Sequence, residues 1–320
     1  MRLNAQPCGS DVAARRVATS SGFLVAPPDL KLCSLLGCIM IGSAEDPPCG
    51  HPESTEHVLV PVSRGRTMHV TVLGPSDGRP TVALHGLGGS TEQNLPALAA
   101  IAEHYQLRTY AIDLPNHGRS SPVGLFEFRV QHFSDLIVEA VRALNIETMV
   151  LFGHSFGGQL AALLAEDLPP DSVQAIFVNP AIGQPWDRKL RLCWRRPWLF
   201  VKLLEELGYN DGNVGRGEVY HAGLLLRSLR DLMLDRHLRP YRRLQVTLAL
   251  LRSCDTASIL ERLTQRGVTP VIIHGQLDRS IPATDGVHFV DGFHDWLHEA
   301  SGPQTLLAAL NPVFRVALPS

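Results

Sequence analysis

Short apolar runs alternate with amphipathic stretches along most of the chain from residue 57 onward. The runs at 81–84, 107–112 and 173–178 are rich in β-prone residues, and a helical period separates the first two over 92–105. Strands that alternate with helices at this spacing are typical of βαβ units, in which helices cover both faces of a mostly parallel sheet. The pattern predicts an α/β fold whose ligands bind beyond the carboxyl ends of the strands.

The same patterns predict the outer elements and the domain organisation. We expect a hairpin at 57–62 and 67–73, a helix at 130–144, strands at 268–274 and 287–290, and a closing helix at 304–310. Residues 1–56 show no sustained period and are expected to be a poorly ordered extension. Helical patterns at 186–207, 218–234 and 241–251 then replace the strands. The expected organisation is a core of 57–183 and 263–320 with a helical cap inserted at 184–262.

The apolar run that ends at Gly153 carries the clearest chemical signal. It is followed by His154, Ser155, Phe156 and Gly157, and then by a helical pattern. A Gly-x-Ser-x-Gly pattern between a strand and a helix predicts a nucleophile elbow. In that turn only residues without a Cβ fit two positions before and two after a strained serine. We interpret Ser155 as a nucleophile.

A serine hydroxyl needs a base and an orienting acid before it can attack, and both should follow strands beyond the elbow. Asp278 follows the strand-like run at 268–274 and the turn at 275–277, and His294 comes just after the last strand-like run. His288 and His298 are rivals for the base, but the first lies inside a strand pattern and the second one helical turn further on. The expected triad is therefore Ser155, Asp278 and His294.

The glycine-rich loop after the run at 81–84 is expected to face the elbow. It contains His85, Gly86, Leu87 and Gly88. Its glycines allow a close approach, so the backbone N–H groups of Leu87 and Phe156 are predicted to form an oxyanion hole. The loop also partly matches a dinucleotide-binding fingerprint, but Thr91 stands where that fingerprint has its third glycine. No nucleotide cofactor is expected.

Composition and charge narrow the classes of function. The chain is 45% hydrophobic and 19% charged with a net charge of −2, which is ordinary for a globular protein and does not point to a nucleic-acid partner. Its six cysteines lack the spacing of a zinc site. We therefore expect free thiols, a cytoplasmic location, a small-molecule substrate, and no metal or other cofactor. The oligomeric state is not predicted.

The predicted cap departs from this charge balance. Residues 184–262 carry 15 Arg and Lys against 9 Asp and Glu, a net charge of +6 that leaves −8 for the rest of the chain. Within the cap, residues 188–199 mix cations with Leu and Trp and could contact an anionic membrane surface or receive an anionic substrate. The simpler prediction packs the Leu and Trp side chains on the sheet edge and leaves the arginines in water.

Together these motifs resemble the α/β-hydrolase superfamily, in the branch of small serine hydrolases with a helical cap, over about residues 57–315. The resemblance is carried by 85–89, 113–120, 153–158, Asp278 and 292–294. It implies Ser155 as nucleophile, Asp278 as acid, His294 as base, and Leu87 with Phe156 as oxyanion donors. Members usually place a helix between acid and base. Here only 15 residues separate the two, although an extended chain of that length reaches roughly 50 Å.

The resulting prediction is a serine hydrolase that cleaves an ester-like acyl bond of a small, largely apolar substrate through an acyl-enzyme. Two alternatives remain open. One is an acyltransferase that uses the same triad, and the other is a non-catalytic small-molecule receptor on the same fold. The serine at the elbow disfavours haloalkane dehalogenation, for which the family uses aspartate at that position.

Overall fold

The computed structural model describes residues 55–316 except 125, 126, 128, 197, 200–202, 204–248 and 254. The chain divides into two units, Met1–Cys49 and Gly50–Ser320, and every described residue belongs to the second. Nearly all of the predicted extension, the helix predicted at 218–234 and most of that predicted at 241–251 lie outside the described residues. None of the described helices is long and apolar enough to cross a membrane.

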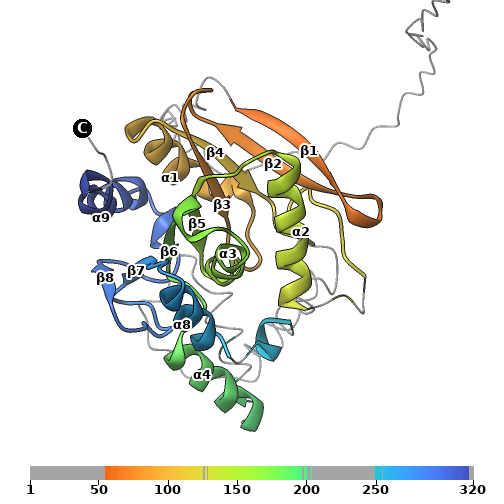
Figure 1. Ribbon diagram of the computed structural model, residues 1–320. Helices are drawn as coiled ribbons and strands as arrows, with labels where there is room; N and C mark the ends of the chain where they lie inside the picture. Colours follow the sequence, from red (N-terminus) through yellow and green to blue (C-terminus); the bar gives the residue numbers. More distant parts are fainter. Residues whose placement is uncertain are drawn as a thin grey trace, which may run out of the picture. The chain divides into compact units, whose positions relative to one another are not determined.

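Eight strands form one sheet in the order β1-β2-β4-β3-β5-β6-β7-β8 (Figure 1). They are β1 (Glu56–Val62), β2 (Arg66–Leu73), β3 (Arg79–Leu84), β4 (Leu107–Ile112), β5 (Met149–His154), β6 (Val173–Val178), β7 (Val271–Gly275) and β8 (Val287–Val290). The β1–β2 and β2–β4 pairs are antiparallel, and the other five pairs are parallel. The prediction of a mostly parallel sheet is confirmed.

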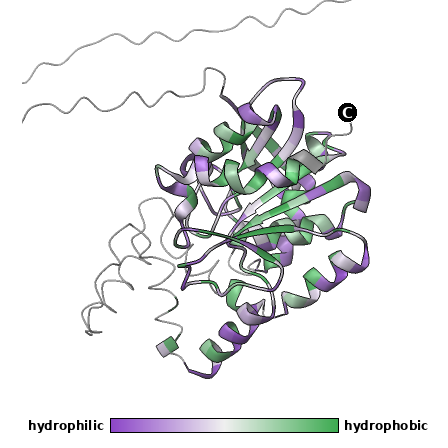
Figure 2. Cartoon of the chain, turned by 90° about the vertical axis from the view of Figure 1, so that its left-hand side faces the viewer, coloured by the Kyte–Doolittle hydropathy of each residue, from purple (hydrophilic) through white to green (hydrophobic). Residues whose placement is uncertain are grey.

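Helices cover both faces of the sheet, as predicted. One face carries α1 (Thr91–His104) and α9 (Gly302–Val316), and the other carries α2 (Val130–Ala143), α3 (Phe156–Glu166) and α8 (Ala257–Gln265) (Figure 1). Successive residues of β5 divide between the two cores, because side chains alternate across a strand. Val150 and Phe152 pack with α1 and α9, whereas Leu151 packs with α2 and α3. Figure 2 shows the hydrophobic colour concentrated on the central strands.

The helix predicted over 186–207 is wrong as a single element. Helix α4 (Gln184–Arg195) ends just before Pro197, where Arg196 has φ −138° and ψ 88°. The residue that precedes a proline is sterically disfavoured in the helical region, so the break could have been read from the sequence. Helix α8 was not predicted. Residues 276–286 between β7 and β8 contain no helix, in agreement with the short interval between Asp278 and His294.

A buried carboxylate joins the two chain segments that lead into and out of the predicted cap. Asp187 in α4 accepts hydrogen bonds from the Thr256 backbone N–H at 3.0 Å, the Thr256 hydroxyl at 2.7 Å and the Ala257 N–H at 2.9 Å. The Thr256 Oγ1 atom also accepts the N–H of Gly183. Asp187 therefore caps α8 from a helix 69 residues away in sequence. The boundaries of the cap stay a prediction.

Replacing this carboxylate should destabilise the fold. Asp187→Ala leaves two buried donors and one partly buried donor without their acceptor, and we expect the free energy of unfolding to fall by about 2–4 kcal/mol. The neighbouring exposed variant Arg188→Ala is the control, with a change within about 0.5 kcal/mol. Urea denaturation followed by circular dichroism measures both. Equal stability of the two variants would contradict a clamp at Asp187.

Candidate active site

Ser155 sits at a sharp turn between β5 and α3 with φ 55° and ψ −119°. A side chain in this region of φ is strained, and such strain persists only where the surrounding structure enforces it. The flanking glycines leave the room that the turn needs. A Cβ on Gly153 would lie 2.6 Å from the Gly157 carbonyl oxygen, and one on Gly157 would lie 2.3 Å from the Leu84 carbonyl oxygen. The glycine positions of the predicted elbow are therefore required sterically.

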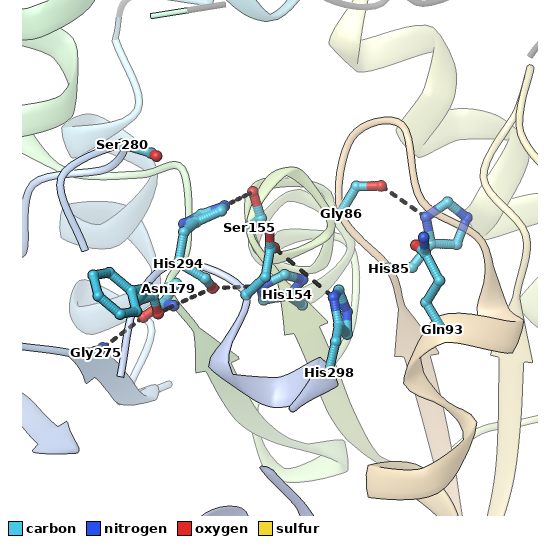
Figure 3. Close-up of polar contacts among 12 residues, drawn as sticks. His85, Gly86, Gln93, His154, Ser155, Asn179, Gly275, Ser280, His294 and His298 are labelled. Atoms are coloured by element: carbon cyan, nitrogen blue, oxygen red, sulfur yellow. Dashed lines mark hydrogen bonds and ion pairs between the residues drawn. The ribbon is translucent and has the colours of Figure 1, made fainter. Parts of the chain in front are cut away.

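The structure brings Ser155, His294 and Asp278 into one hydrogen-bonded chain. The Ser155 hydroxyl lies 2.9 Å from His294 Nε2, on the dashed line in Figure 3. His294 Nδ1 lies 2.7 Å from Asp278 Oδ2. The other carboxylate oxygen of Asp278 accepts the backbone N–H groups of Ser280 at 2.8 Å and Ile281 at 3.0 Å. The short interval between acid and base therefore allows the contact.

Burial and charge act in opposite directions on the acid and the base. The Asp278 side chain is fully buried and the His294 side chain is 5% exposed. Burial alone would raise the pKa of Asp278 and lower that of His294. The attraction between the two groups and their hydrogen bond outweigh this effect, so the pKa of Asp278 lies below its ordinary value and that of His294 above it. This pairing holds the proton on Nδ1, so Nε2 is the ring nitrogen that accepts the hydrogen bond from the Ser155 hydroxyl.

Two residues that the sequence analysis missed support this pair. Asn179, directly after β6, accepts the Gly275 N–H at 2.7 Å and donates to the His294 carbonyl oxygen (Figure 3). Lys189 in α4 donates from Nζ to the carbonyl oxygens of Arg279 at 2.9 Å and Ser280 at 2.7 Å. The segment after Asp278 is thus held from β6 and from α4. A polar residue at a strand's carboxyl end was the available signal for Asn179, and nothing in the sequence indicated Lys189.

The loop expected to face the elbow does lie against it. A Cβ on Gly86 would lie 3.2 Å from both Ser155 Cβ and His154 Nδ1. Within the described part of the chain, the backbone N–H groups of Leu87 and Phe156 donate to no protein acceptor. Phe156 is the first residue of α3, whose N-terminal N–H groups carry partial positive charge. The positions suit the predicted donors, and their role in an oxyanion hole stays a prediction.

Two neutral histidines hold this loop in place. His85 donates from Nδ1 to the Gly86 carbonyl oxygen at 2.8 Å and accepts the Leu114 N–H at Nε2 at 3.0 Å. His117 accepts the Gly88 N–H at Nε2, 3.1 Å away. A ring nitrogen that accepts an N–H must be unprotonated, and burial lowers the pKa of His85 in agreement with this. The loop is therefore tied to the segment that follows β4.

The carboxylate of Asp113 fixes the segment that follows β4. It accepts the Thr91 N–H at 2.9 Å, the Arg119 N–H at 3.0 Å and His69 Nδ1 at 2.9 Å. Burial opposes the charged form, but these hydrogen bonds hold the pKa of Asp113 well below its ordinary value. One ionised carboxylate thus connects β2, the start of α1 and the segment after β4.

The other histidines near the elbow do not replace His294. His288 is exposed on β8. His298 Nε2 donates to Asn94 Oδ1 at 2.7 Å, and its ring packs edge-on against His154. His154 is buried and donates from Nε2 to the His294 carbonyl oxygen at 3.2 Å. Burial, together with the neighbouring histidines, lowers the pKa of His154 well below its ordinary value, so it is neutral.

Among the described residues, one group has the character of a metal site. His154, His294 and Asp295 place ligand atoms within 4.8 Å of one another. Both ring nitrogens of His294 are already engaged, by Ser155 and by Asp278. Binding a metal through His294 would therefore break the hydrogen-bonded chain to the serine.

The charge of Asp113 should appear in the pH dependence of stability. Because its pKa is lower in the folded state than in the unfolded chain, its contribution is complete above the unfolded pKa of about 3.9 and is lost as the pH falls below it. Asp113→Asn should lower the free energy of unfolding by about 1–3 kcal/mol near neutral pH. It should also flatten the decline between about pH 5 and pH 3.

Urea denaturation across that range measures both effects, with the exposed variant Asp77→Asn as control. A decline as steep in Asp113→Asn as in the wild type would contradict the role of this carboxylate.

Comparisons with known proteins agree with this fold. The family model for the alpha/beta hydrolase fold matches residues 80–241. A protein of Mycobacterium phage D29 named as a non-heme haloperoxidase is 27% identical over 258 residues, which cover 76% of this chain and 90% of the phage protein.

Solved structures share the fold at low sequence identity. A protein described as a lipase from Acinetobacter baumannii AYE aligns with a TM-score of 0.61 at 17% identity, over 82% of this chain and 91% of the other. A carboxylesterase of the thaumarchaeon Nitrososphaera gargenis aligns with a TM-score of 0.59 at 17% identity, over 82% of this chain and 98% of the other. At 17% identity these structures show the fold alone.

Proposed function

The chain is an alpha/beta hydrolase, a member of the family whose model it matches, and we propose that it is a serine hydrolase with a Ser-His-Asp triad. It would cleave an ester-like acyl bond of a small, largely apolar substrate through an acyl-enzyme. The observation that carries the proposal is the chain of contacts from the Ser155 hydroxyl to His294 and from His294 to Asp278, at 2.9 and 2.7 Å. The first distance is short enough for direct proton transfer from the serine to the imidazole, and the second is short enough for the carboxylate to orient the imidazole by a hydrogen bond.

The first half of the proposed reaction forms the acyl-enzyme. Ser155 Oγ attacks the acyl carbon while its proton passes to His294 Nε2, and the carbonyl oxygen becomes an oxyanion near the N–H groups of Leu87 and Phe156. The imidazolium is stabilised by the Asp278 carboxylate. It then gives its proton to the leaving alcohol or thiol as the bond to the acyl carbon breaks.

The second half regenerates the serine. Water takes the place of the leaving group, His294 Nε2 accepts one of its protons, and the hydroxide attacks the acyl carbon. Collapse of the second tetrahedral intermediate releases the carboxylic acid and returns the proton to Ser155. Every proton that His294 accepts is handed back, so the enzyme ends as it began and no cofactor takes part.

Two alternative functions differ in whether they use the triad. An alcohol or amine in place of water would make the protein an acyltransferase, which product analysis with added acceptors distinguishes. A non-catalytic receptor would not need the hydroxyl-to-imidazole contact, and the close contact disfavours it. A cytoplasmic location stays the expectation from the cysteine pattern.

Removing the nucleophile should abolish turnover. Ser155→Ala should lower hydrolysis of a short-chain p-nitrophenyl ester by a factor on the order of 10⁴ or more, because the remaining groups can only bind and polarise the substrate. The partly exposed Ser172→Ala is the matched control and should keep full activity. Turnover by Ser155→Ala at the wild-type rate would end the proposal.

The pH profile should reflect the raised pKa of His294. The imidazole acts as a base only when neutral, so kcat/KM should rise with pH through an acid limb above the ordinary histidine pKa of about 6.5. Burial opposes this shift and the Asp278 carboxylate produces it. In Asp278→Asn the limb should move to lower pH while the plateau rate falls by roughly 10⁴. A limb at the same pH in both enzymes would show that Asp278 does not act on His294.

A further inference from the structure

The outward side of α4 and the turn after it form an unusual surface, which we call the α4 surface. It comprises Arg188, Arg191, Leu192, Trp194, Arg195, Arg196 and Trp198. Helix α4 is amphipathic, and its inner side buries Trp186, Leu190 and Cys193. The seven residues of the α4 surface are all exposed.

Three large apolar side chains point out of this surface. Leu192 is 46% exposed, Trp194 55% and Trp198 63%. The expectation that the Leu and Trp residues of 188–199 pack on the sheet edge is wrong for these three, whereas Leu190 is buried in the hydrophobic core. Trp194 is held in this orientation, because its Nε1 donates to the Leu251 carbonyl oxygen at 2.8 Å. Exposed tryptophans mark surfaces that contact an apolar or interfacial phase.

The charge of the same surface has one sign. Four of its residues are arginines, and the guanidinium of Arg196 lies 5.8 Å from the centroid of the Trp198 ring. The one carboxylate in residues 184–199, that of Asp187, is turned inward and buried in its hydrogen bonds to Thr256 and Ala257. Arginines that alternate with aromatic and aliphatic side chains complement a phase that is anionic at its surface and apolar beneath it.

From these observations we propose that the protein docks on anionic lipid bilayers through the α4 surface. Arg188, Arg195 and Arg196 pair with lipid phosphates, while Trp194, Trp198 and Leu192 enter the headgroup region, as in helices that lie in the interface plane. The combination of cationic and apolar side chains favours a bilayer over nucleic acid. Nucleic acid would bind the arginines but would leave Leu192 in water. The inner side of α4 carries Lys189, whose contacts reach the segment after Asp278. Docking would therefore place the bilayer on the side of α4 opposite that contact.

Tryptophan fluorescence offers a direct test, because two of the four tryptophans are fully buried and two belong to the α4 surface. The full-length protein is mixed with vesicles of phosphatidylcholine alone, or with added phosphatidylglycerol, whose acyl chains carry bromine as a short-range quencher. We expect sedimentation with the phosphatidylglycerol vesicles, weakened by salt, together with a blue shift and quenching of the emission. No sedimentation would overturn the proposal, and so would sedimentation without quenching, which indicates a general affinity for polyanions.

Paired variants assign the binding to this surface. Arg188→Gln with Arg195→Gln should weaken partition to the anionic vesicles on the order of 30-fold, and Trp198→Ala should remove much of the quenching. Arg129→Gln with Arg142→Gln removes the same charge from exposed positions around α2 and should leave partition unchanged. Equal weakening in both pairs would contradict the proposal. Ester turnover in solution, measured in parallel, should be normal in all variants because none alters the triad.

Discussion

The contact between Asp278 and His294 is the constraint on which the site depends. The carboxylate is fully buried, so it can stay ionised only if charge and hydrogen bonds compensate for the lost water. His294 and the N–H groups of Ser280 and Ile281 supply that compensation. The chain brings these groups together although no helix lies between β7 and β8. Asn179 and Lys189 hold the segment instead, each through hydrogen bonds to backbone groups.

The other half of the site is organised around a second buried carboxylate. Asp113 ties β2 to the start of α1 and to the segment after β4. Through His85 and His117 that segment fixes the loop that lies against Ser155. The strained backbone of the serine therefore lies against a loop whose position is fixed by hydrogen bonds. A preorganised loop of this kind is what electrostatic stabilisation of an oxyanion requires, since donors that need no rearrangement cost least in the transition state.

Much of the fold could be read from the sequence, because apolar runs bounded by glycine and aspartate set the strand ends. Ser155, Asp278 and His294 could be found for the same reason: each follows a strand whose carboxyl end lies on one sheet edge. Lys189 and Asp187 could not, because their roles arise from hydrogen bonds to residues 69 or more positions away, which leave no local pattern. Asn179 left only one signal, its position directly after a strand. The exposure of Trp194 could not be predicted either. A helical period shows that a helix has an apolar side, but it does not show which of the apolar residues lie outside the part that is buried.

The central claim is that Ser155 is activated by an assembled triad, and its reaction with a fluorophosphonate tests this most directly. Intact-mass spectrometry and peptide mapping would follow the adduct in the wild type and in His294→Gln, which removes the base and leaves the elbow in place. The account predicts stoichiometric labelling at Ser155 in the wild type and labelling slower by orders of magnitude in the variant. A wild-type protein that does not react, or a variant that reacts equally fast, would contradict it.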